Sequence, residues 1–304
     1  MKRCRTFGDL EKSFTDLDKS KIAILPVPYD ETSTWMKGAD KAPCAIIEAS
    51  AAMELYDIET HSEVYKRGIH TSPPLECRRH PEEMVREVDE KVRELIEAGK
   101  FVVVLGGEHS VTIGALKAHA NAFKNLSVLQ LDAHLDMRDE YEGSRYNHAC
   151  VMARAREICP AVQVGIRSMS AEEKDKALRE DIFFAADIAG KNDWQARAVE
   201  RLSRDVYISI DLDVFDPSVM PSTGTPEPGG LGWYEVVRFL RRVSEERRVA
   251  GFDIVELCPN VSDKAPDFTA AKLVYKLLSY VFIHAPEGHA RKGVDESPSV
   301  QGSA

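Results

Sequence analysis

Residues 126–136 read Leu-Ser-Val-Leu-Gln-Leu-Asp-Ala-His-Leu-Asp, an apolar segment that ends in Asp132, His134 and Asp136. The apolar part is typical of a strand buried in a parallel sheet. Alternate side chains of a strand point the same way, so the three polar residues should converge at its carboxyl end. Ionisable groups are costly to bury unless something binds them. A divalent metal is the simplest ligand, although a solvated surface loop could also hold these three residues.

Two further apolar segments end in the same way. Val206–Ile210 is followed by Asp211 and Asp213, and Phe101–Leu105 is followed, after Gly-Gly-Glu, by His109. The carboxyl ends of parallel strands meet at one edge of an open α/β sheet, which is where ligands bind. Three such endings are hard to explain as solvated loops, so the sequence predicts a metal site at this edge.

The rest of the chain alternates between strand and helix patterns. Strands are expected at 21–27, 64–70 (weak), 101–105, 126–132, 161–166, 182–185, 206–210 and 248–255. Helices are expected at 43–55, 81–98, from 110, from 148 to 158, and at 171–179, 192–203, 233–247 and 266–282. This alternation predicts a three-layer α/β/α sandwich with a mostly parallel sheet. No linker divides the chain, so we expect one domain over 1–285 and a disordered tail over 286–304.

Composition narrows the class of protein. The 304 residues are 43% hydrophobic and carry a net charge of −10. Without a compensating basic block, this charge argues against nucleic acid as a partner and mildly favours a cationic substrate. No segment approaches the ~20 apolar residues of a membrane span. The six cysteines contain no C-x-x-C pair, which favours thiols in a reducing compartment and a cytoplasmic location.

The candidate ligands define the kind of metal site. They are His109, Asp132, His134, Asp136, Asp211 and Asp213. Their four carboxylates carry a charge of −4, which two divalent cations would neutralise and one would not. Oxygen and imidazole ligands suit Mn²⁺ and, less specifically, Fe, Co, Ni or Zn. We therefore expect two Mn²⁺ per chain, and metals ~3.5–4 Å apart can supply a hydroxide nucleophile near neutral pH.

Three motifs carry a resemblance to a known family. Gly-Gly-Glu-His109-Ser, Asp132-Ala-His134-Leu-Asp136 and Ser209-Ile-Asp211-Leu-Asp213-Val-Phe-Asp-Pro are similar to the signatures of the ureohydrolases, which include arginase and agmatinase. The segments 28–39 and 223–231 extend the resemblance over nearly the whole chain. The resemblance implies a three-layer α/β/α fold, often a trimer or hexamer, and a binuclear manganese enzyme. Such an enzyme hydrolyses a guanidino group to an amine and urea.

The resemblance also implies roles for single residues. His109 and Asp136 would hold one metal, His134 and Asp213 the other, and Asp132 and Asp211 would bridge them. Glu256 is similar to the family's guanidinium-binding glutamate, and a carboxylate can accept paired hydrogen bonds from a guanidinium. His148 matches its proton-transfer histidine, and Thr225 is a further candidate substrate-binding residue. The plainer alternatives are a solvated acid beyond a strand for Glu256 and a surface or capping residue for His148.

The substrate is predicted from residues 138–147, Arg-Asp-Glu-Tyr-Glu-Gly-Ser-Arg-Tyr-Asn. Arginases have an Asn-rich stretch here, whereas Asp139, Glu140 and Glu142 should repel the α-carboxylate of arginine and tolerate an amine. The acidic stretch over 138–147 resembles the corresponding part of agmatinases. We therefore expect hydrolysis of agmatine to putrescine and urea. Aminopropylagmatine, guanidinobutyrate and arginine are alternative substrates, because Arg138 or Arg145 could pair with an anionic tail. An alternative of another class is a metal-binding relative without activity.

Overall fold

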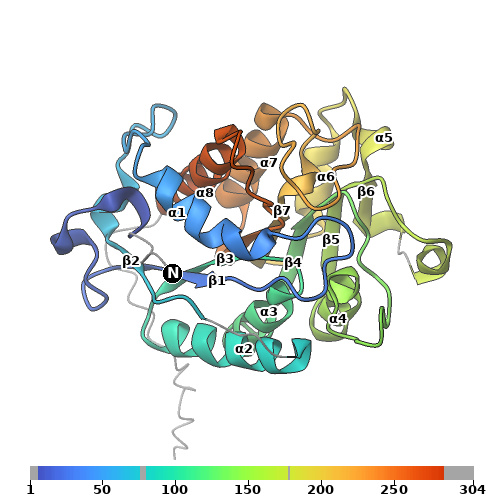
Figure 1. Ribbon diagram of the computed structural model, residues 1–304. Coiled ribbons are helices and arrows are strands. Elements are labelled where there is room, and N and C mark those ends of the chain that lie inside the picture. The colour runs from blue at the N-terminus through green and yellow to red at the C-terminus, as the bar shows by residue number, and fades with distance from the viewer. Residues whose placement is uncertain (1–5, 76–79, 177–178, 284–304) are drawn as a thin grey trace, which may run out of the picture.

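One parallel sheet forms the centre of the molecule (Figure 1). The computed structural model describes residues 6–75, 80–176 and 179–283. Within these residues the sheet has eight strands in the order β2-β1-β3-β8-β7-β4-β5-β6, and all neighbouring strands are parallel. The strands are β1 (Ile22–Val27), β2 (Ile69–Thr71), β3 (Phe101–Gly106), β4 (Leu126–Leu131), β5 (Ala161–Ile166), β6 (Ile182–Phe184), β7 (Asp205–Asp211) and β8 (Arg248–Val255).

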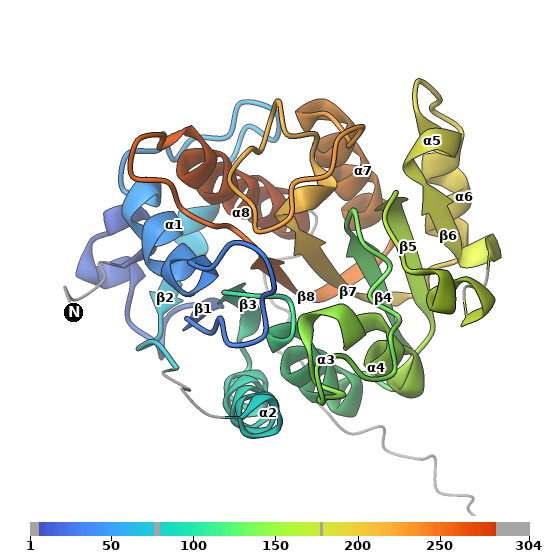
Figure 2. The same cartoon turned by 45° about the vertical axis from the view of Figure 1, so that its right-hand side comes forward.

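Helices cover both faces of this sheet (Figures 1 and 2). One face carries α1 (Ala42–Ser50), α6 (Trp194–Glu200), α7 (Trp233–Glu246) and α8 (Ala265–Ile283). The other carries α2 (Pro81–Glu97), α3 (Val111–Ala122) and α4 (Val151–Ile158), and the short α5 (Ala185–Ile188) follows β6. The predicted three-layer α/β/α fold is confirmed.

Helix α2 illustrates how the sequence builds a layer. Pro81 occupies its first turn, where a missing N–H costs nothing, and Glu82 and Glu83 complement the positive end of the helix dipole. One stripe of the helix buries Met84, Val85, Val88, Val92 and Leu95. Each such side chain contributes roughly 1.5–3 kcal/mol by leaving water. The stripe packs on α3, and so holds in place the helix that follows His109.

Some expected elements differ from the observed ones. The helix expected at 43–55 ends at Ser50, whose hydroxyl donates to the Ile47 carbonyl and accepts from the Gly8 N–H. The segment expected as a helix at 171–179 forms a 3-10 helix over Ala171–Lys176. That segment has no apolar stripe with which to pack, and its one buried residue is Glu173. The expected tail, 286–304, lies outside the described residues.

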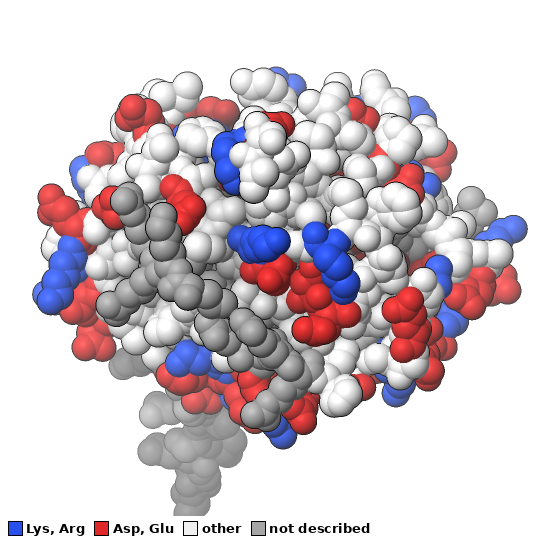
Figure 3. Space-filling view, in the orientation of Figure 1, with Lys and Arg blue, Asp and Glu red and all other residues white. Residues whose placement is uncertain are grey.

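Two expectations from composition concern cysteines and membranes. Cys44 is disulfide-bonded, so the expectation of thiols throughout is wrong there, whereas Cys150, Cys159 and Cys258 are free. Spacing along the sequence does not reveal which cysteines meet in space. Among the described residues, no helix is long and apolar enough to cross a bilayer. On the face in Figure 3, the described acidic and basic side chains lie interspersed rather than in one block of either sign.

Candidate metal centre and active site

Four neighbouring strands deliver the predicted site residues to one edge of the sheet. His109 follows β3, Glu256 follows β8, Asp211 ends β7, and Asp132 and Asp136 follow β4. These strands are far apart in sequence but adjacent in the order β3-β8-β7-β4. The fold therefore brings together the three endings that the sequence analysis singled out, as the general rule for open α/β sheets requires.

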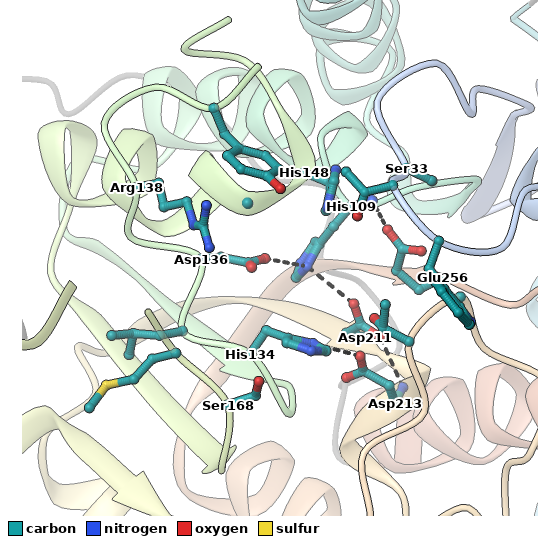
Figure 4. Close-up of a pocket in the computed structure, with 18 of the residues that line it drawn as sticks. Ser33, His109, His134, Asp136, Arg138, His148, Ser168, Asp211, Asp213 and Glu256 are labelled. Atoms are coloured by element: carbon teal, nitrogen blue, oxygen red, sulfur yellow. Dashed lines mark hydrogen bonds and ion pairs between the residues drawn. The ribbon is translucent and has the colours of Figure 1, made fainter. Parts of the chain in front are cut away.

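The first group of ligands lies around the His109 ring, and Figure 4 shows two of them, Asp136 and Asp211. Its Nδ1 lies 3.1 Å from Asp132 Oδ2, 3.0 Å from Asp136 Oδ2 and 3.4 Å from Asp211 Oδ2. Yet this buried nitrogen has no hydrogen-bond partner among the described residues. A nitrogen crowded by carboxylate oxygens without a hydrogen bond fits a coordinating ligand, and nitrogen with oxygen suits a divalent transition metal.

A second group of ligands adjoins the first. The Nδ1 atom of His134 lies 2.8 Å from Asp213 Oδ2 and 3.7 Å from Asp132 Oδ1. Two triads can each hold an ion, namely His109–Asp132–Asp211 and His134–Asp132–Asp213. Asp132 belongs to both, which is the arrangement of a binuclear site. Asp136 contacts His109 but lies outside both triads, so its part as a ligand stays a prediction.

The acidic groups of this centre are not balanced by their surroundings. Burial raises the pKa of Asp136 to about 7, and the charge of Asp132 adds to the effect. Burial also raises the pKa of Asp211 well above its usual value, aided by Asp213 and Asp132. For Asp132 burial acts in the same sense, but His109 and His134 outweigh it and lower its pKa. The centre thus carries more buried negative charge than two imidazoles offset, and bound cations would supply the rest.

Outer hydrogen bonds, which the sequence motifs do not predict, hold Asp132. Gln130 Nε2 donates to Asp132 Oδ2 at 2.6 Å, and Gln163 Nε2 donates to Gln130 Oε1 at 2.6 Å. Both glutamines are fully buried within apolar strands. That contrast, a polar residue inside an apolar strand next to a ligand motif, is the signal that could have identified them.

A second chain of hydrogen bonds holds His109. Its Nε2 lies 2.9 Å from Ser209 Oγ, which donates to Asp253 Oδ1 at 2.8 Å. Tyr207 donates its hydroxyl to the other oxygen of Asp253 at 2.7 Å. The ring of His109 is therefore fixed from behind, so that Nδ1 faces the carboxylates.

Glu256 turns into the site through an unusual backbone conformation. Its φ is 65°, in the left-handed region, and Asp136 has a φ of 54°. Such conformations cost about 1–3 kcal/mol for residues other than glycine and are concentrated at functional sites. Glu256 accepts a hydrogen bond from the His109 backbone N–H at 2.7 Å. Burial, with the neighbouring charge of Glu108, raises its pKa well above the usual value.

Glu256, His148 and Thr225 line one cavity, of about 180 Å³, together with His109, His134, Asp136, Asp211 and Asp213. His148 begins a 3-10 turn over His148–Cys150. Burial is the main cause that lowers the pKa of His148, to about 4, which favours a neutral ring at pH 7. The predicted catalytic and substrate-binding residues therefore share the cavity that adjoins the metal triads.

The predicted acidic loop contributes no acidic side chain to the wall of this cavity. Among the described residues that line the cavity, Asp139, Glu140 and Glu142 do not appear. Asp139 instead pairs with Lys176 at 2.6 Å and with the buried Arg154. Cations of the chain therefore offset the charge of Asp139, and the preference for an amine over a carboxylate tail stays a prediction.

The two arginines of the same loop also separate. Arg145 pairs with Glu157 at 2.8 Å on the surface. Arg138 lines the cavity, where its guanidinium lies 4.2 Å from the centre of the Tyr141 ring and its Nε 4.0 Å from Glu173. Arg138 is thus the cation of this loop that a substrate tail would meet.

The loop after β1 is fastened to the loop that carries His109. Gly107 donates its backbone N–H to the Val27 carbonyl, and Glu108 donates to the Tyr29 carbonyl, both at 2.9 Å. A Cβ atom at position 107 would lie 2.0 Å from the Tyr29 oxygen. Only glycine permits this approach. The loop over residues 28–38, which supplies residues 33–36 to the cavity wall, is thereby held against the metal ligands.

Comparisons with known proteins agree with this geometry. A family model described as "Arginase family" matches residues 20–279. An N(1)-aminopropylagmatine ureohydrolase of Synechocystis is 40% identical over 280 residues, covering 88% of this chain and 92% of the relative. An agmatinase of Pyrococcus horikoshii is 34% identical over 273 residues, covering 89% and 95%.

Solved structures give the same result. The agmatine ureohydrolase of Thermoplasma volcanium superposes with a TM-score of 0.83 at 31% identity, covering 93% of this chain and 95% of that one. The family match spans the four strands that deliver the ligands, and the relatives are matched over most of their own length. The chain therefore belongs to the arginase family, as a ureohydrolase with a binuclear metal site.

Proposed function

We propose that the protein hydrolyses a linear guanidine with a cationic, polyamine-like tail, with N1-aminopropylagmatine as the preferred substrate. One observation carries the reaction: two metal-ligand triads and Glu256 adjoin a single cavity. The preference for this substrate rests on relatives at 39–40% identity, from Synechocystis and Thermus thermophilus, that are named aminopropylagmatine ureohydrolases. Water would replace the amine at the guanidinium carbon and release urea and a polyamine.

The metal would be Mn²⁺, since oxygen and imidazole ligands without thiolate suit it. His109 and Asp136 would hold one ion, His134 and Asp213 the other, and Asp132 and Asp211 would bridge. A pair of such ions supplies a hydroxide nucleophile near neutral pH and stabilises charge that develops on the substrate.

The remaining roles belong to residues of the cavity wall. The carboxylate of Glu256 would accept paired hydrogen bonds from the guanidinium and orient its carbon toward the metal centre. The neutral ring of His148 would take up a proton and deliver it to the leaving amine. Thr225 lies beside Gly224 in the same wall and would contact the substrate through its hydroxyl.

The outer part of the cavity suits an alkyl-ammonium tail. Trp35, Met36, Tyr141 and Met169 line it, and the side chain of Trp35 is 75% exposed. Aromatic faces attract ammonium groups, and methionine adapts to methylene chains of varied length. Arg138 is the one Lys or Arg among the described lining residues, and Tyr141 and Glu173 already contact it. An α-carboxylate, as in arginine, would therefore have to compete for it.

Agmatine is a second candidate substrate. The Pyrococcus horikoshii relative and the Thermoplasma volcanium structure are both named for activity on agmatine. Agmatine carries the same guanidinobutyl group but lacks the aminopropyl extension, so it would leave the outer wall partly uncovered.

A substrate panel tests the proposal. Urea release is measured with Mn²⁺ for N1-aminopropylagmatine, agmatine, guanidinobutyrate and arginine at one pH. We expect the highest kcat/KM for aminopropylagmatine and then agmatine. A higher value for arginine or guanidinobutyrate would contradict the cationic tail, and no urea from any of the four would contradict the reaction.

A further inference from the structure

We propose that Thr32 and Glu108 are positioning residues that orient His148 and determine which of its ring nitrogens carries the proton. The inference rests on the proposed function, in which His148 moves a proton. Neither residue was assigned a part in the reaction by the sequence motifs. Both lie at the junction between the loop over 28–38 and the strand end that carries His109.

The carboxylate of Glu108 is surrounded by hydrogen-bond donors. This side chain is fully buried, and Thr32 is 9% exposed. Thr32 donates its backbone N–H to Oε2 at 2.6 Å, and its hydroxyl lies 2.8 Å from each carboxylate oxygen. Ser110 donates its hydroxyl to Oε1. Burial raises the pKa of Glu108, but donors converge on both of its oxygens and oppose that rise by stabilising the ionised form. An ionised carboxylate acts only as an acceptor.

The hydroxyl of Thr32 lies between Glu108 and His148. It has one hydrogen, and that hydrogen is directed to Glu108. Its oxygen can then only accept from His148, whose backbone N–H lies at 3.0 Å and whose Nδ1 lies at 3.1 Å. Nδ1 therefore carries a hydrogen.

This tautomer determines which ring nitrogen of His148 can accept a proton. A neutral imidazole has one N–H, so a hydrogen on Nδ1 leaves Nε2 with a free lone pair. His148 can then accept a proton at Nε2 and later release it from the same atom. The other tautomer would present N–H at Nε2 and could not accept a proton there. A carboxylate that fixes a catalytic histidine in one tautomer is an established device, and here a threonine hydroxyl stands between the two.

The chain offers a matched control for this arrangement. Thr60 is 8% exposed and donates its backbone N–H and hydroxyl to Asp57 Oδ1 at 2.9 and 3.0 Å. Thr60 does not line the cavity described above. Thr32→Val and Thr60→Val thus remove equivalent hydroxyls, one next to His148 and one away from it.

The experiment compares Thr32→Val, Thr32→Ser and Thr60→Val as Mn²⁺-loaded enzymes. Losing the hydroxyl should lower kcat by about 10- to 100-fold, the equivalent of roughly 1–3 kcal/mol, with a smaller change in KM. The pH profile of kcat should change shape, because both tautomers become populated. Thr32→Ser should recover kcat to within several-fold of the parent. Thr60→Val should lower the melting temperature without changing kcat or its pH profile.

A second measurement reads the tautomer directly and needs no variant to be active. Nitrogen-15 NMR of the parent, loaded with diamagnetic Zn²⁺ and assigned with His148→Asn, should show a hydrogen on Nδ1 of His148. A hydrogen on Nε2 alone would overturn the inference. So would a Thr32→Val enzyme with parental kcat, or one whose lost activity follows lost metal at an unchanged pH profile. If the parent itself releases no urea from any guanidine, the proposed function fails instead.

Discussion

The metal centre and a cluster beneath α8 both bury acidic side chains, but only one of them has a built-in cation. In the cluster, Asp57 is 2% exposed and lies 2.9 Å from Lys276 Nζ, which also lies 3.0 Å from Glu59 Oε1. Tyr280 donates to the other oxygen of Glu59 at 2.7 Å. At the metal centre, four carboxylates face two imidazoles, and among the described residues the ion pairs of these carboxylates are with His109 and His134.

The pKa values of Asp57 and Asp136 are shifted in opposite directions, as expected if only Asp57 has a cation of the chain beside it. Burial acts to raise the pKa of Asp57, but hydrogen bonds from Lys276 and Thr60 outweigh burial and lower it. Burial raises the pKa of Asp136 to about 7, and the nearby His109 does not reverse that. The same residue type is therefore stabilised as an anion in one place and destabilised in the other. A buried acidic side chain therefore indicates a ligand site only where no cation of the chain compensates its charge.

The strongest test of the comparison removes a carboxylate ligand from a triad. Asp132→Asn and Asp211→Asn should each lose most bound metal and nearly all urea release, because each removes a negative charge that the cations require. Asp57→Asn should leave both quantities unchanged. Metal analysis by mass spectrometry, together with urea assays, measures this. Fewer than one divalent ion per chain in a fully active parent would rule out the binuclear centre.

The next test distinguishes the proton-transfer role of His148 from the role of the metal ligands. His148→Asn should lower kcat by roughly 10²–10⁴-fold, the usual span for a positioned acid–base group. Its metal content should equal that of the parent, since His148 belongs to neither triad. Steady-state kinetics and metal analysis on the same preparation measure both. Parental turnover would remove His148 from the mechanism.

The cluster beneath α8 should respond in stability rather than activity. Lys276→Met leaves the buried Asp57 and the partly exposed Glu59 without their cation. The loss of the buried pair should lower the unfolding free energy by about 3–5 kcal/mol at pH 7. Adding Asp57→Asn to Lys276→Met should recover part of this loss. Urea denaturation measures both, and equal stability of Lys276→Met and the parent would contradict the comparison.

The same cluster predicts a pH dependence of stability. Because the pKa of Asp57 is lowered from its ordinary 3.8, its contribution is complete above that value and is lost as the pH falls below it through the folded-state pKa. The parent should therefore lose stability more steeply below about pH 4 than Lys276→Met does. Denaturation midpoints between pH 5 and pH 3 measure this, and parallel curves would show that Lys276 does not hold Asp57 as an anion.

The smallest expected effect lies at the outer wall of the cavity. Trp35→Ala should raise KM for N1-aminopropylagmatine by about 2- to 5-fold, corresponding to an exposed cation–π contact of about 0.5–1 kcal/mol. Agmatine, which lacks the extension, should be affected less. Tyr234→Ala is the control, since Tyr234 is 61% exposed on α7 and does not line the cavity. An equal rise for both substrates would place the tail elsewhere.

The sequence predicted the parts of this molecule that repeat a physical pattern. Apolar strands that end in acids or histidine give the sheet, its active edge and both triads, because a parallel sheet allows few other arrangements. The sequence does not predict a side chain's contacts where they depend on a partner that is distant along the chain. Asp139 pairs with Arg154 and Lys176 and does not line the cavity, and no local pattern around Asp139 reveals these partners.

Long-range contacts also explain what was missed at the site. Glu108 lies in a sequence motif that gives it no role of its own, yet it binds Thr32, which lies 76 positions away along the chain. Gln163 reaches Asp132 only through Gln130 on the adjacent strand. Such residues are recognisable beforehand only as polar residues in apolar surroundings, which marks them as unusual without naming a partner.

The close contact at Gly107 has a consequence for protein engineering. Because no side chain fits between position 107 and the Tyr29 carbonyl, the loop over 28–38 and the turn before His109 form one transplantable unit. A designer who exchanges this loop with that of a relative, to alter which polyamine is accepted, must carry over the matching glycine turn as well. If the loop were exchanged alone, it would pack differently against the turn. Thr32 would then lose its hydrogen bonds with Glu108 and His148.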